Sequence, residues 1–592
     1  MITLGQIQVH AGQPERNLDN IAKMAEQTPE GGLLILPEMA VPGYMIGDRW
    51  NSTSYIQECH EFNEDILDIL EARNITGIWG NIDFDETKKN EDGTIRKYNA
   101  AFVGQGGKVV AKQYKTLLPN YRMFDDKRYF TSLKTLAEEE GKDLIEYYQP
   151  IEIEIDGVKT RVAVLICEDI WNINGDYGID PLEMTKSYNP DLIAVTSASP
   201  FGLNKFDMRS RVLKNASKNT KLAYVNPIGI QNNGKNVFVF EGGSAIYENR
   251  KIKQGVKDYT TNTSTNIEQE KSEIEQIYET TIYYIQEFFK NIGQTKVVIG
   301  LSGGLDSAVS AALCTIALGA ENVTTVNMPS RFNSDTTKDL AKECAQNLGV
   351  DYKIFPIQEI IDTKIQKITQ TTGKIPTDFE KQNIQARERG EILSDLAANI
   401  GGVFTNNGNK DEVALGYATL YGDVSGALCT LGDLYKTQVY DLARYINTKH
   451  GEMIPQGIID IIPSAELGED QNVDEGEGDP FNYEFVGKLN QALIEKKCEP
   501  YDILEKYSSG TLQKYLDLPE NIDTYFPTAE AFSENLEDIW TRLQINFFKR
   551  VQSPPILTIS KSSFGFEYRE AQNGVYFSRK YEELKKQILE NK

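Results

Sequence analysis

The stretch VVIGLSGGLDSAVSAAL, residues 297–313, changes character at its centre. Apolar and β-branched residues predict a buried strand as far as Gly300, and the small-residue pattern after the glycines predicts a helix. Between them, Gly303 and Gly304 can adopt conformations that expose backbone N–H groups. The following helix directs its N-terminal donors to the same point. The stretch therefore predicts a cradle for an anion such as a phosphate.

The turn also carries side chains suited to phosphate chemistry. Ser302 and Ser307 offer hydroxyl donors, and Asp306 could hold Mg²⁺ beside the phosphates. The chain contains no GxxxxGK[ST] loop. An ordinary tight turn between strand and helix is the alternative interpretation.

SGGxDS between a buried strand and a helix resembles the PP-loop of the ATP pyrophosphatase families. Those families split ATP between its α- and β-phosphates, adenylating an acceptor and releasing pyrophosphate. The resemblance implies ATP as co-substrate, Mg²⁺ as cofactor and an ATP site made of Gly300, Leu301, Ser302, Gly303, Gly304, Leu305, Asp306, Ser307 and Asn407.

Strands and helices alternate downstream of the turn. NVTTVNMP and YKIFPI read as further strands, and residues 336–348 have helical periodicity. Such alternation predicts a parallel, doubly wound sheet.

Five downstream stretches resemble the NAD synthetase family. They are MPSRFNSDTT (328–337), NIQARERGEIL (383–393), NNGNKDEVALGYATLYGD (406–423), LGDLYKTQVYDLA (431–443) and PSAEL (463–467). PP-loop members of that family amidate the nicotinate carboxylate of deamido-NAD with ATP and ammonia. The resemblance implies this activity and a PP-loop ATP pyrophosphatase fold.

The same resemblance assigns individual residues. Asp306 and Glu412 would hold the metal, and the positions expected to contact deamido-NAD or the phosphates are Asn383, Arg387, Asp423 and Lys436. Taken singly, each charged residue could equally form a surface ion pair. One position departs from the family, because Asn407 stands where a threonine is usual.

The first half contains three short motifs that each place a polar residue at or just after the end of a predicted strand. LPEMAVPGY (36–44) holds Glu38, KTLLPNY (115–121) holds Lys115, and LICEDIW (165–171) holds Cys167. Alone, a cysteine at the end of an apolar strand is more often part of the core. Together, in this order and spacing, they resemble the Glu-Lys-Cys triad of the nitrilase (carbon–nitrogen hydrolase) superfamily, over roughly residues 1–250. This resemblance implies an αββα sandwich.

The triad chemistry needs no histidine, and the chain has only three. A thiolate at Cys167 is the nucleophile, Glu38 takes its proton, and Lys115 stabilises the developing oxyanion. Fusion to a domain that consumes ammonia makes glutamine the expected amide donor. The residues expected to bind glutamine are Tyr44, Tyr121, Ser197, Ser199 and Arg209. Family members commonly carry FDExRYF after the lysine, and here Asp126 is one methylene shorter.

The expected domains are a nitrilase-like domain over 1–250, a linker over 251–275 and a NAD synthetase domain over 276–592. The linker prediction rests on the polar stretch 257–276; a long surface loop is the alternative. We also expect helices over 18–27, 56–73 and 274–291, one strand-like stretch over 100–114, and an acidic mobile loop over 467–480 that orders over the adenylate.

Composition limits the possible partners. At 592 residues the chain exceeds a single hydrophobic core. Its net charge of −25 and its lack of basic runs disfavour nucleic acid. We expect no membrane span, no signal peptide, a cytoplasmic location with six unpaired cysteines, and, as both families usually show, a homo-oligomer.

Together the motifs resemble the glutamine-dependent NAD synthetases. The implied reaction converts deamido-NAD to NAD through an adenylated intermediate, with AMP, pyrophosphate and glutamate as by-products and an internal channel for ammonia. Two alternatives remain at this point. One is a PP-loop amidotransferase for another carboxylate or a tRNA base, and the other is a non-catalytic protein built on both folds.

Overall fold

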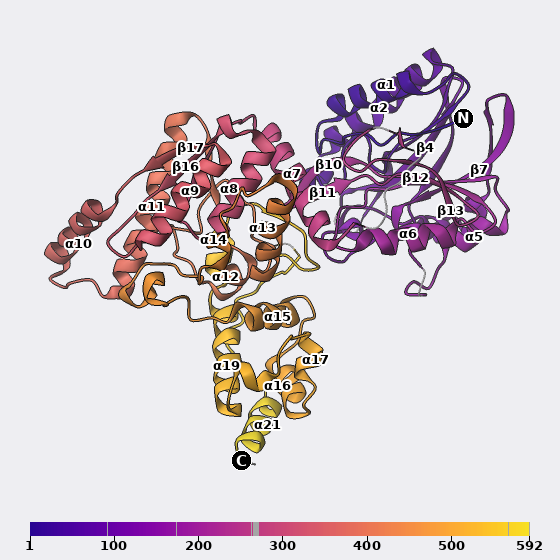
Figure 1. The fold of residues 1–592 in the computed structure, drawn as a ribbon. Helices are drawn as coiled ribbons and strands as arrows, with labels where there is room; N and C mark the ends of the chain where they lie inside the picture. Colours follow the sequence, from indigo (N-terminus) through magenta and orange to yellow (C-terminus); the bar gives the residue numbers. More distant parts are fainter. Residues whose placement is uncertain (91–92, 173–174, 262, 265–270, 566, 591–592) are drawn as a thin grey trace. The chain divides into compact units, whose positions relative to one another are not determined.

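The computed structural model of the protein describes residues 1–592 except 91–92, 173–174, 262, 265–270, 566 and 591–592. The chain divides into two compact units (Figure 1). One comprises Met1–Asn233 and Val237–Lys271, and the other comprises Gly234–Asn236 and Ser272–Lys592. Each is described by itself.

The structure differs from the expected linker over 251–275. Its first residues form β13 (Lys251–Val256), which pairs antiparallel with β12 (Ala245–Glu248) and belongs to the first unit. β14 (Thr263–Ser264) pairs with β13 in turn. The sequence did not predict this strand because its composition is polar. Residues 251–254 alternate between exposed and partly buried positions near the margin of a sheet, so they need not be apolar. Residues 262 and 265–270 of the linker prediction lie outside the described residues.

The first unit contains two sheets. The five-stranded sheet has the order β1 (Ile2–Leu4), β2 (Leu33–Ile35), β3 (Thr76–Lys89), β4 (Ile95–Gln105) and β5 (Lys108–Tyr114). The seven-stranded sheet has the order β14, β13, β12, β9 (Lys221–Val225), β8 (Leu192–Thr196), β7 (Val158–Ile166) and β6 (Ile151–Ile155). β1–β3 are mutually parallel, as are β7–β9, and the remaining pairs within these two sheets are antiparallel. Between β9 and β12 the chain forms β10 (Ile228–Asn233) and β11 (Asn236–Glu241).

The period-two alternation of strand side chains explains the layers. Leu33 and Ile35 of β2 point into a core shared with Val164 and Ile166 of β7. Leu34, between them, packs with the helices α1 (Pro14–Gln27) and α2 (Thr53–Ala72) on the outer face. The outer face of the other sheet packs against α6 (Lys205–Ala216) and α5 (Pro181–Ser187). The layers are therefore helix, sheet, sheet and helix, and the predicted αββα sandwich is confirmed.

Two local details differ from the sequence expectation. The strand-like stretch over 100–114 is a hairpin, because Gly106 (φ +60°) and Gly107 (φ +68°) supply the left-handed turn between β4 and β5. Helix α1 begins at Pro14 rather than near residue 18, since proline is well suited to a first turn that needs no N–H donor.

The second unit holds a parallel sheet. Its strands follow the order β20 (Ile556–Leu557), β19 (Leu428–Cys429), β18 (Val403–Asn406), β15 (Val297–Gly300), β16 (Val323–Asn327) and β17 (Asp351–Ile354). The chain runs outward from β15 to β16 and β17, then returns to β18 on the other side. This reversal opens a crevice at the carboxyl end of β15, the point where such sheets bind ligands. The predicted doubly wound parallel sheet is confirmed.

Helices cover both faces of this sheet and continue into a C-terminal cluster (Figure 1). Those around the sheet are α7 (Glu273–Ile292), α8 (Leu305–Leu318), α9 (Asp335–Leu348), α10 (Gln358–Thr372), α11 (Asp378–Ile400), α12 (Lys410–Leu415), α13 (Lys436–His450) and α14 (Gln456–Asp460). The later ones are α15 (Tyr483–Ile494), α16 (Pro500–Ser508), α17 (Leu512–Leu516), α18 (Ile522–Tyr525), α19 (Ala529–Ile545), α20 (Phe547–Gln552) and α21 (Arg579–Glu590). In the described part of the chain, no helix is both long and apolar enough to cross a bilayer.

Candidate functional site

Cys167 stands at the point where β7 ends. It is the first residue of a single 3₁₀ turn, Cys167–Ile170, and its backbone has φ +44°. A left-handed conformation is strained for a residue with a β-carbon, and such strain gathers at functional turns. The side chain is buried, and its Sγ accepts a hydrogen bond of 3.3 Å from Ser197 Oγ.

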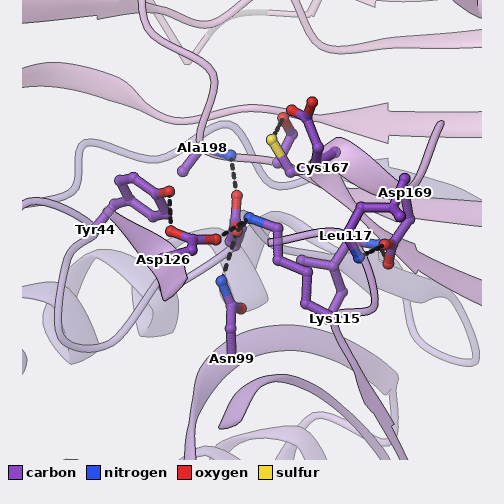
Figure 2. Close-up of polar contacts among 12 residues, drawn as sticks. Tyr44, Asn99, Lys115, Leu117, Asp126, Cys167, Asp169 and Ala198 are labelled. Atoms are coloured by element: carbon purple, nitrogen blue, oxygen red, sulfur yellow. Dashed lines mark hydrogen bonds and ion pairs between the residues drawn. The ribbon is translucent and has the colours of Figure 1, made fainter. Parts of the chain in front are cut away.

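Lys115 joins two buried carboxylates beside this turn (Figure 2). Its Nζ lies 2.7 Å from Glu38 Oε1 and 2.7 Å from Asp126 Oδ2. Asn99 Nδ2 donates to Glu38 Oε1 at 2.7 Å, and the backbone N–H of Ala198 donates to Glu38 Oε2 at 2.8 Å. The glutamate is thus held on both oxygens, and the three predicted triad residues occupy one buried region.

Electrostatics set the resting protonation state. Burial raises the pKa of the Cys167 thiol far above its ordinary value, the charge of Glu38 raises it further, and Lys115 partly opposes this. Burial alone would lower the pKa of Lys115, but Asp126 and Glu38 raise it well above its usual range. The site therefore rests as thiol and ammonium, and thiolate formation requires a base.

Asp126 reaches Lys115 despite its short side chain. Its Oδ1 accepts a hydrogen bond from the Tyr44 hydroxyl, and its Oδ2 faces the ammonium. Burial raises the pKa of the Asp126 carboxyl, and Lys115 counters this rise.

Asp169 is a site residue that the sequence reasoning missed. Its Oδ1 accepts from the N–H of Leu117 at 2.8 Å and of Thr116 at 3.1 Å, and its Oδ2 accepts from Ile166 N at 3.3 Å. It therefore ties the segment after Lys115 to the turn that carries the cysteine. A carboxylate two residues beyond a strand-end cysteine, where the N–H groups of a helical turn begin, was the available signal.

The five expected glutamine-binding residues separate into two groups. Ser197 and Tyr44 belong to the network around Cys167 and Lys115. The others make contacts of their own: Arg209 Nη1 with Glu241 Oε1 at 2.8 Å, Ser199 N with Asn226 Oδ1 at 2.7 Å, and Tyr121 OH with Glu168 at 3.1 and 3.2 Å.

Lys205 is a second residue that the motifs did not reveal. Burial lowers its pKa to about 8, and it interacts electrostatically with Glu241 and Cys167. Its Nζ donates to Pro200 O at 2.9 Å. Unlike Arg209, which pairs with Glu241, Lys205 forms no ion pair with a carboxylate of the residues that the structure describes.

In the second unit, the turn 302–307 lies at the crevice expected from the strand order. Gly303 has φ +96°, and a β-carbon there would lie 2.1 Å from Thr337 O. Ser302 Oγ accepts from Gly304 N at 3.2 Å, and Ser307 Oγ accepts from Ser302 N at 3.3 Å. The serine hydroxyls thus pre-form the turn from inside.

A cavity of about 330 Å³ opens on this turn. Predicted ATP, metal and deamido-NAD residues that line it are Gly300, Leu301, Ser302, Gly304, Leu305, Asp306, Ser307, Asn407, Glu412, Asp423 and Lys436. Asn407 bridges two strand ends there, since its Nδ2 donates to Gly300 O at 3.2 Å and its Oδ1 accepts from Thr405 Oγ1 at 2.9 Å. The side-chain amide of Asn407 therefore links the ends of β18 and β15 by hydrogen bonds.

Two carboxylates meet in the cavity. Asp306 comes from the first turn of α8 and Glu412 from the first turn of α12. Asn409 links them, because its Nδ2 donates to Asp306 Oδ1 and its backbone N–H to Glu412 Oε2, both at 3.1 Å. Lys436 Nζ forms an ion pair with Asp306 Oδ2 and lies 3.9 Å from Glu412 Oε1. Burial, with the charge of Asp306, raises the pKa of Glu412 to about 8.

These residues fit a hard divalent cation. Their donors are carboxylate oxygens, and a nearby cation would oppose both the burial and the charge of Asp306 that raise the pKa of Glu412. Among the described residues no group of three or more His, Cys, Asp or Glu is arranged to hold a metal ion. Asp306 and Glu412 would therefore share the ion with phosphate oxygens and water, as Mg²⁺ sites commonly do.

The remaining predicted substrate residues do not all face this cavity. Asn383 Oδ1 accepts from Thr419 Oγ1 at 2.8 Å, and Asp423 accepts from Thr419 N, so both residues contact Thr419. Arg387 is exposed and lines a different cavity of about 480 Å³. Arg389, which the motifs did not single out, lines the first cavity instead.

Arg389 is fixed by Met328 O at 3.3 Å from its Nε and by Asn333 Oδ1 at 3.1 Å from its Nη2. Both arginines lie in ARERG, and helical geometry turns residues two apart to different faces.

The predicted mobile loop is anchored over the first cavity. Asp479 accepts from Tyr417 OH at 3.1 Å and from Tyr483 OH at 2.9 Å. Gln471 Oε1 accepts from Leu467 N at 2.9 Å, and its Nε2 donates to Tyr417 OH at 3.1 Å.

Two family profiles match the chain. The carbon-nitrogen hydrolase profile covers residues 1–250, and the NAD synthase profile covers residues 277–517.

Relatives match along nearly the whole length of this chain. A glutamine-dependent NAD(+) synthetase from Acinetobacter baylyi is 31% identical, over 87% of this chain and 92% of the relative. One from Thermotoga maritima is 29% identical, over 96% of this chain and 97% of the relative. The structure of a glutamine-dependent NAD+ synthetase from Acinetobacter baumannii in complex with ADP aligns with a TM-score of 0.66 at 26% identity, covering 97% of this chain and 98% of that one.

Proposed function

The chain belongs to the family of glutamine-dependent NAD(+) synthetases, and from this premise we propose how its two units divide the reaction. The enzyme amidates deamido-NAD to NAD with ATP, using glutamine as the ammonia donor. The observation that carries the division is that each unit holds its own buried reactive cluster: Cys167 with Glu38 and Lys115 in one, and the phosphate turn with Asp306 and Glu412 in the other.

Cys167 is the proposed nucleophile of the glutaminase. Glu38 takes the thiol proton, the thiolate attacks the side-chain amide of glutamine, and ammonia leaves with that proton. Water then hydrolyses the thioester to glutamate with Glu38 again as base. Lys115 balances the charge of Glu38 during both proton transfers and offers positive charge to the oxyanion. The hydrogen bonds from Asn99 and Ala198 support this role, since they hold the carboxylate in one orientation.

Glutamine recognition is assigned to side chains around this cluster. Tyr44, Tyr121, Ser197 and Ser199 remain the proposed polar contacts. Lys205 is proposed to take the α-carboxylate, because its charge is not neutralised by an ion pair of the kind that Arg209 makes with Glu241. Arg209 is then proposed to have a structural role, through its ion pair with Glu241.

In the synthetase unit, the carboxylate of deamido-NAD attacks the α-phosphate of ATP, and pyrophosphate leaves into the cradle 302–307. Ammonia then displaces AMP from the adenylate. Asp306 and Glu412 are the residues that would hold Mg²⁺, which when bound neutralises phosphate charge. Asn407 is proposed to hold the cradle beside β18. The proposed contacts for deamido-NAD and phosphates are Asn383, Asp423, Arg387 and Lys436. Arg389 is added to them because it lines the cavity.

A homo-oligomer is proposed on the basis of exposed apolar side chains in the second unit. Ile375, just before α11, is 74% exposed, and Phe379, in the first turn of α11, is 71% exposed. Light scattering after size exclusion tests this proposal, since a monomeric mass would contradict it. A cytoplasmic location is proposed from the six free cysteines.

The test of the overall function uses glutamine labelled with ¹⁵N in its side-chain amide. We expect NAD one mass unit heavier than the unlabelled product, formed only when ATP, deamido-NAD and glutamine are all present. Unlabelled NAD, or no NAD, would contradict the proposed division of labour.

A further inference from the structure

Lys436 holds a position that a metal ion would also favour. Its side chain is almost fully buried, and its ammonium contacts Asp306 and approaches Glu412, the two carboxylates assigned to Mg²⁺. A single cationic centre thus already lies within 4 Å of both carboxyl groups. The remaining oxygens of both carboxylates are bonded to Asn409, so the pair is held together independently of the lysine.

The backbone and the side chain of Lys436 are held differently. Its backbone N–H donates to Asp411 Oδ2 at 2.9 Å, which fixes the start of α13. Its Nζ, by contrast, has the two carboxylates and the face of Tyr483, at 5.3 Å from the ring centroid. The long side chain can therefore change direction by rotamer changes alone while the helix stays in place.

We propose, on the basis of the proposed function, that Lys436 and a divalent cation compete for the same pair of carboxylates. Metal binding expels the ammonium from between Asp306 and Glu412. Two positive centres cannot share so small a pair without strong repulsion, because like charges at contact distance in a buried site are only weakly screened by solvent. Exchange, rather than joint occupancy, follows.

The exchange gives the lysine a second position. Lys436 lines the same cavity as Ser302, Gly304 and Ser307, so the expelled ammonium can turn toward phosphates held at the cradle once a nucleotide is bound. The site then gains a cation for the phosphates only after the metal has arrived. This orders the assembly of the site, with metal preceding the lysine contact.

The experiment measures Mn²⁺ binding to the full chain without nucleotide, from the electron paramagnetic resonance signal of free Mn²⁺. Lys436→Met removes the competing charge and keeps a similar shape, so we expect at least about tenfold tighter binding than in the wild type. Lys449→Met, on the exposed end of the same helix, carries the same charge change and should bind as the wild type does. Adding Asp306→Asn to Lys436→Met should remove the gain.

A second measurement on the unaltered protein covers the case in which Lys436→Met does not fold, which thermal melting would reveal. Amine acetylation followed by mass spectrometry should show faster labelling of Lys436 when Mg²⁺ is added, with Lys449 unchanged. Equal or weaker Mn²⁺ affinity in folded Lys436→Met, or slower or unchanged labelling of Lys436, would overturn the exchange. Neither readout depends on turnover, so failure of NAD synthesis from labelled glutamine would be a separate result.

Discussion

Lys115 Nζ lies as close to Asp126 Oδ2 as to Glu38 Oε1, at 2.7 Å from each. One buried ammonium therefore serves two buried carboxylates, one of them shared with a tyrosine hydroxyl. The cluster carries one more negative than positive charge, which explains why removing different members should have unequal effects.

The first prediction concerns stability and activity of this cluster. Lys115→Met leaves both carboxylates without a cation and should lower the unfolding free energy by about 3–5 kcal/mol. Asp126→Asn leaves a one-to-one pair, so it should cost much less stability while lowering glutaminase kcat by about 100-fold. Urea unfolding followed by tryptophan fluorescence checks this, because Trp50, Trp79 and Trp171 all lie in the first unit. Equal destabilisation by both changes would contradict the charge argument.

The second prediction separates the two reactions. Cys167→Ala should lose glutamine-driven NAD formation by at least about 1,000-fold, since it removes the thiol proposed to form the thioester. Ammonia-driven formation, measured with excess ammonium at pH 8.5 or above, should persist because the synthetase cluster lies in the other unit. Loss of both activities in a folded variant would be the contrary result.

The third prediction tests the phosphate turn with two adjacent glycines. Gly303→Ala should reduce synthesis from either nitrogen source by at least about 100-fold, because its β-carbon would meet Thr337 O at 2.1 Å and displace the cradle. Gly304→Ala is the matched control, since its backbone has φ −89° and its nearest contact would be Ser302 Oγ at 3.4 Å. Glutaminase activity should survive in both, and equal losses of synthesis would argue against the steric account.

The fourth prediction concerns pH. Burial raises the pKa of Asp169 to about 7, whereas the unfolded chain has a value near 4. Between these values the folded protein keeps a proton that the unfolded chain has lost, so the contribution of Asp169 to stability falls as pH rises from about 4 to 7 and is constant above. Asp169→Asn has no ionisable carboxyl group at this position, so its stability lacks this pH dependence.

The stability of Asp169→Asn relative to the wild type should therefore increase by a few kcal/mol between about pH 5 and 7 and then stay level. Urea midpoints measured across that range check the slope, and a constant offset from the lost ionisable oxygen does not affect it. A difference that declines toward pH 7 would refute the assignment.

The fifth prediction follows from the fusion of the two domains. If ammonia stays within the protein, an added enzyme that consumes free ammonia should leave glutamine-driven NAD formation unchanged while stopping ammonia-driven formation. Inhibition of both would show release into solvent.

Much of this protein was predictable from local patterns. The motifs at strand ends predicted Glu38, Lys115 and Cys167, and the glycine turn after a buried strand predicted the cradle 302–307. These predictions need only residue types and their spacing within short stretches of the chain. The family predicted from these motifs is confirmed by the full-length relatives. The helices over 56–73 and 274–291 were also predicted to within a few residues, because their apolar periodicity is strong.

Other features could not be predicted from the sequence because they depend on contacts between segments that are distant along the chain. Asp169 matters through backbone donors more than 50 positions away, and only the pairing of strands brings these together. The separation of Arg387 from Arg389 depends on how α11 is rotated against the sheet. β13 was predicted as linker because a strand near the margin of a sheet, here between β12 and the two-residue β14, need not be apolar.

The sequence by itself determined which reactive groups this protein has, since Cys167, Glu38, the turn 302–307 and the carboxylates of Asp306 and Glu412 all lie in short motifs. Only the tertiary structure decided which charges share a partner: that Asp126 reaches Lys115 despite its length, and that Lys436 lies against the carboxylates of Asp306 and Glu412. The physical reason is that a motif fixes backbone direction over a few residues, whereas ångström-scale contacts between charges depend on how separate strands and helices pack.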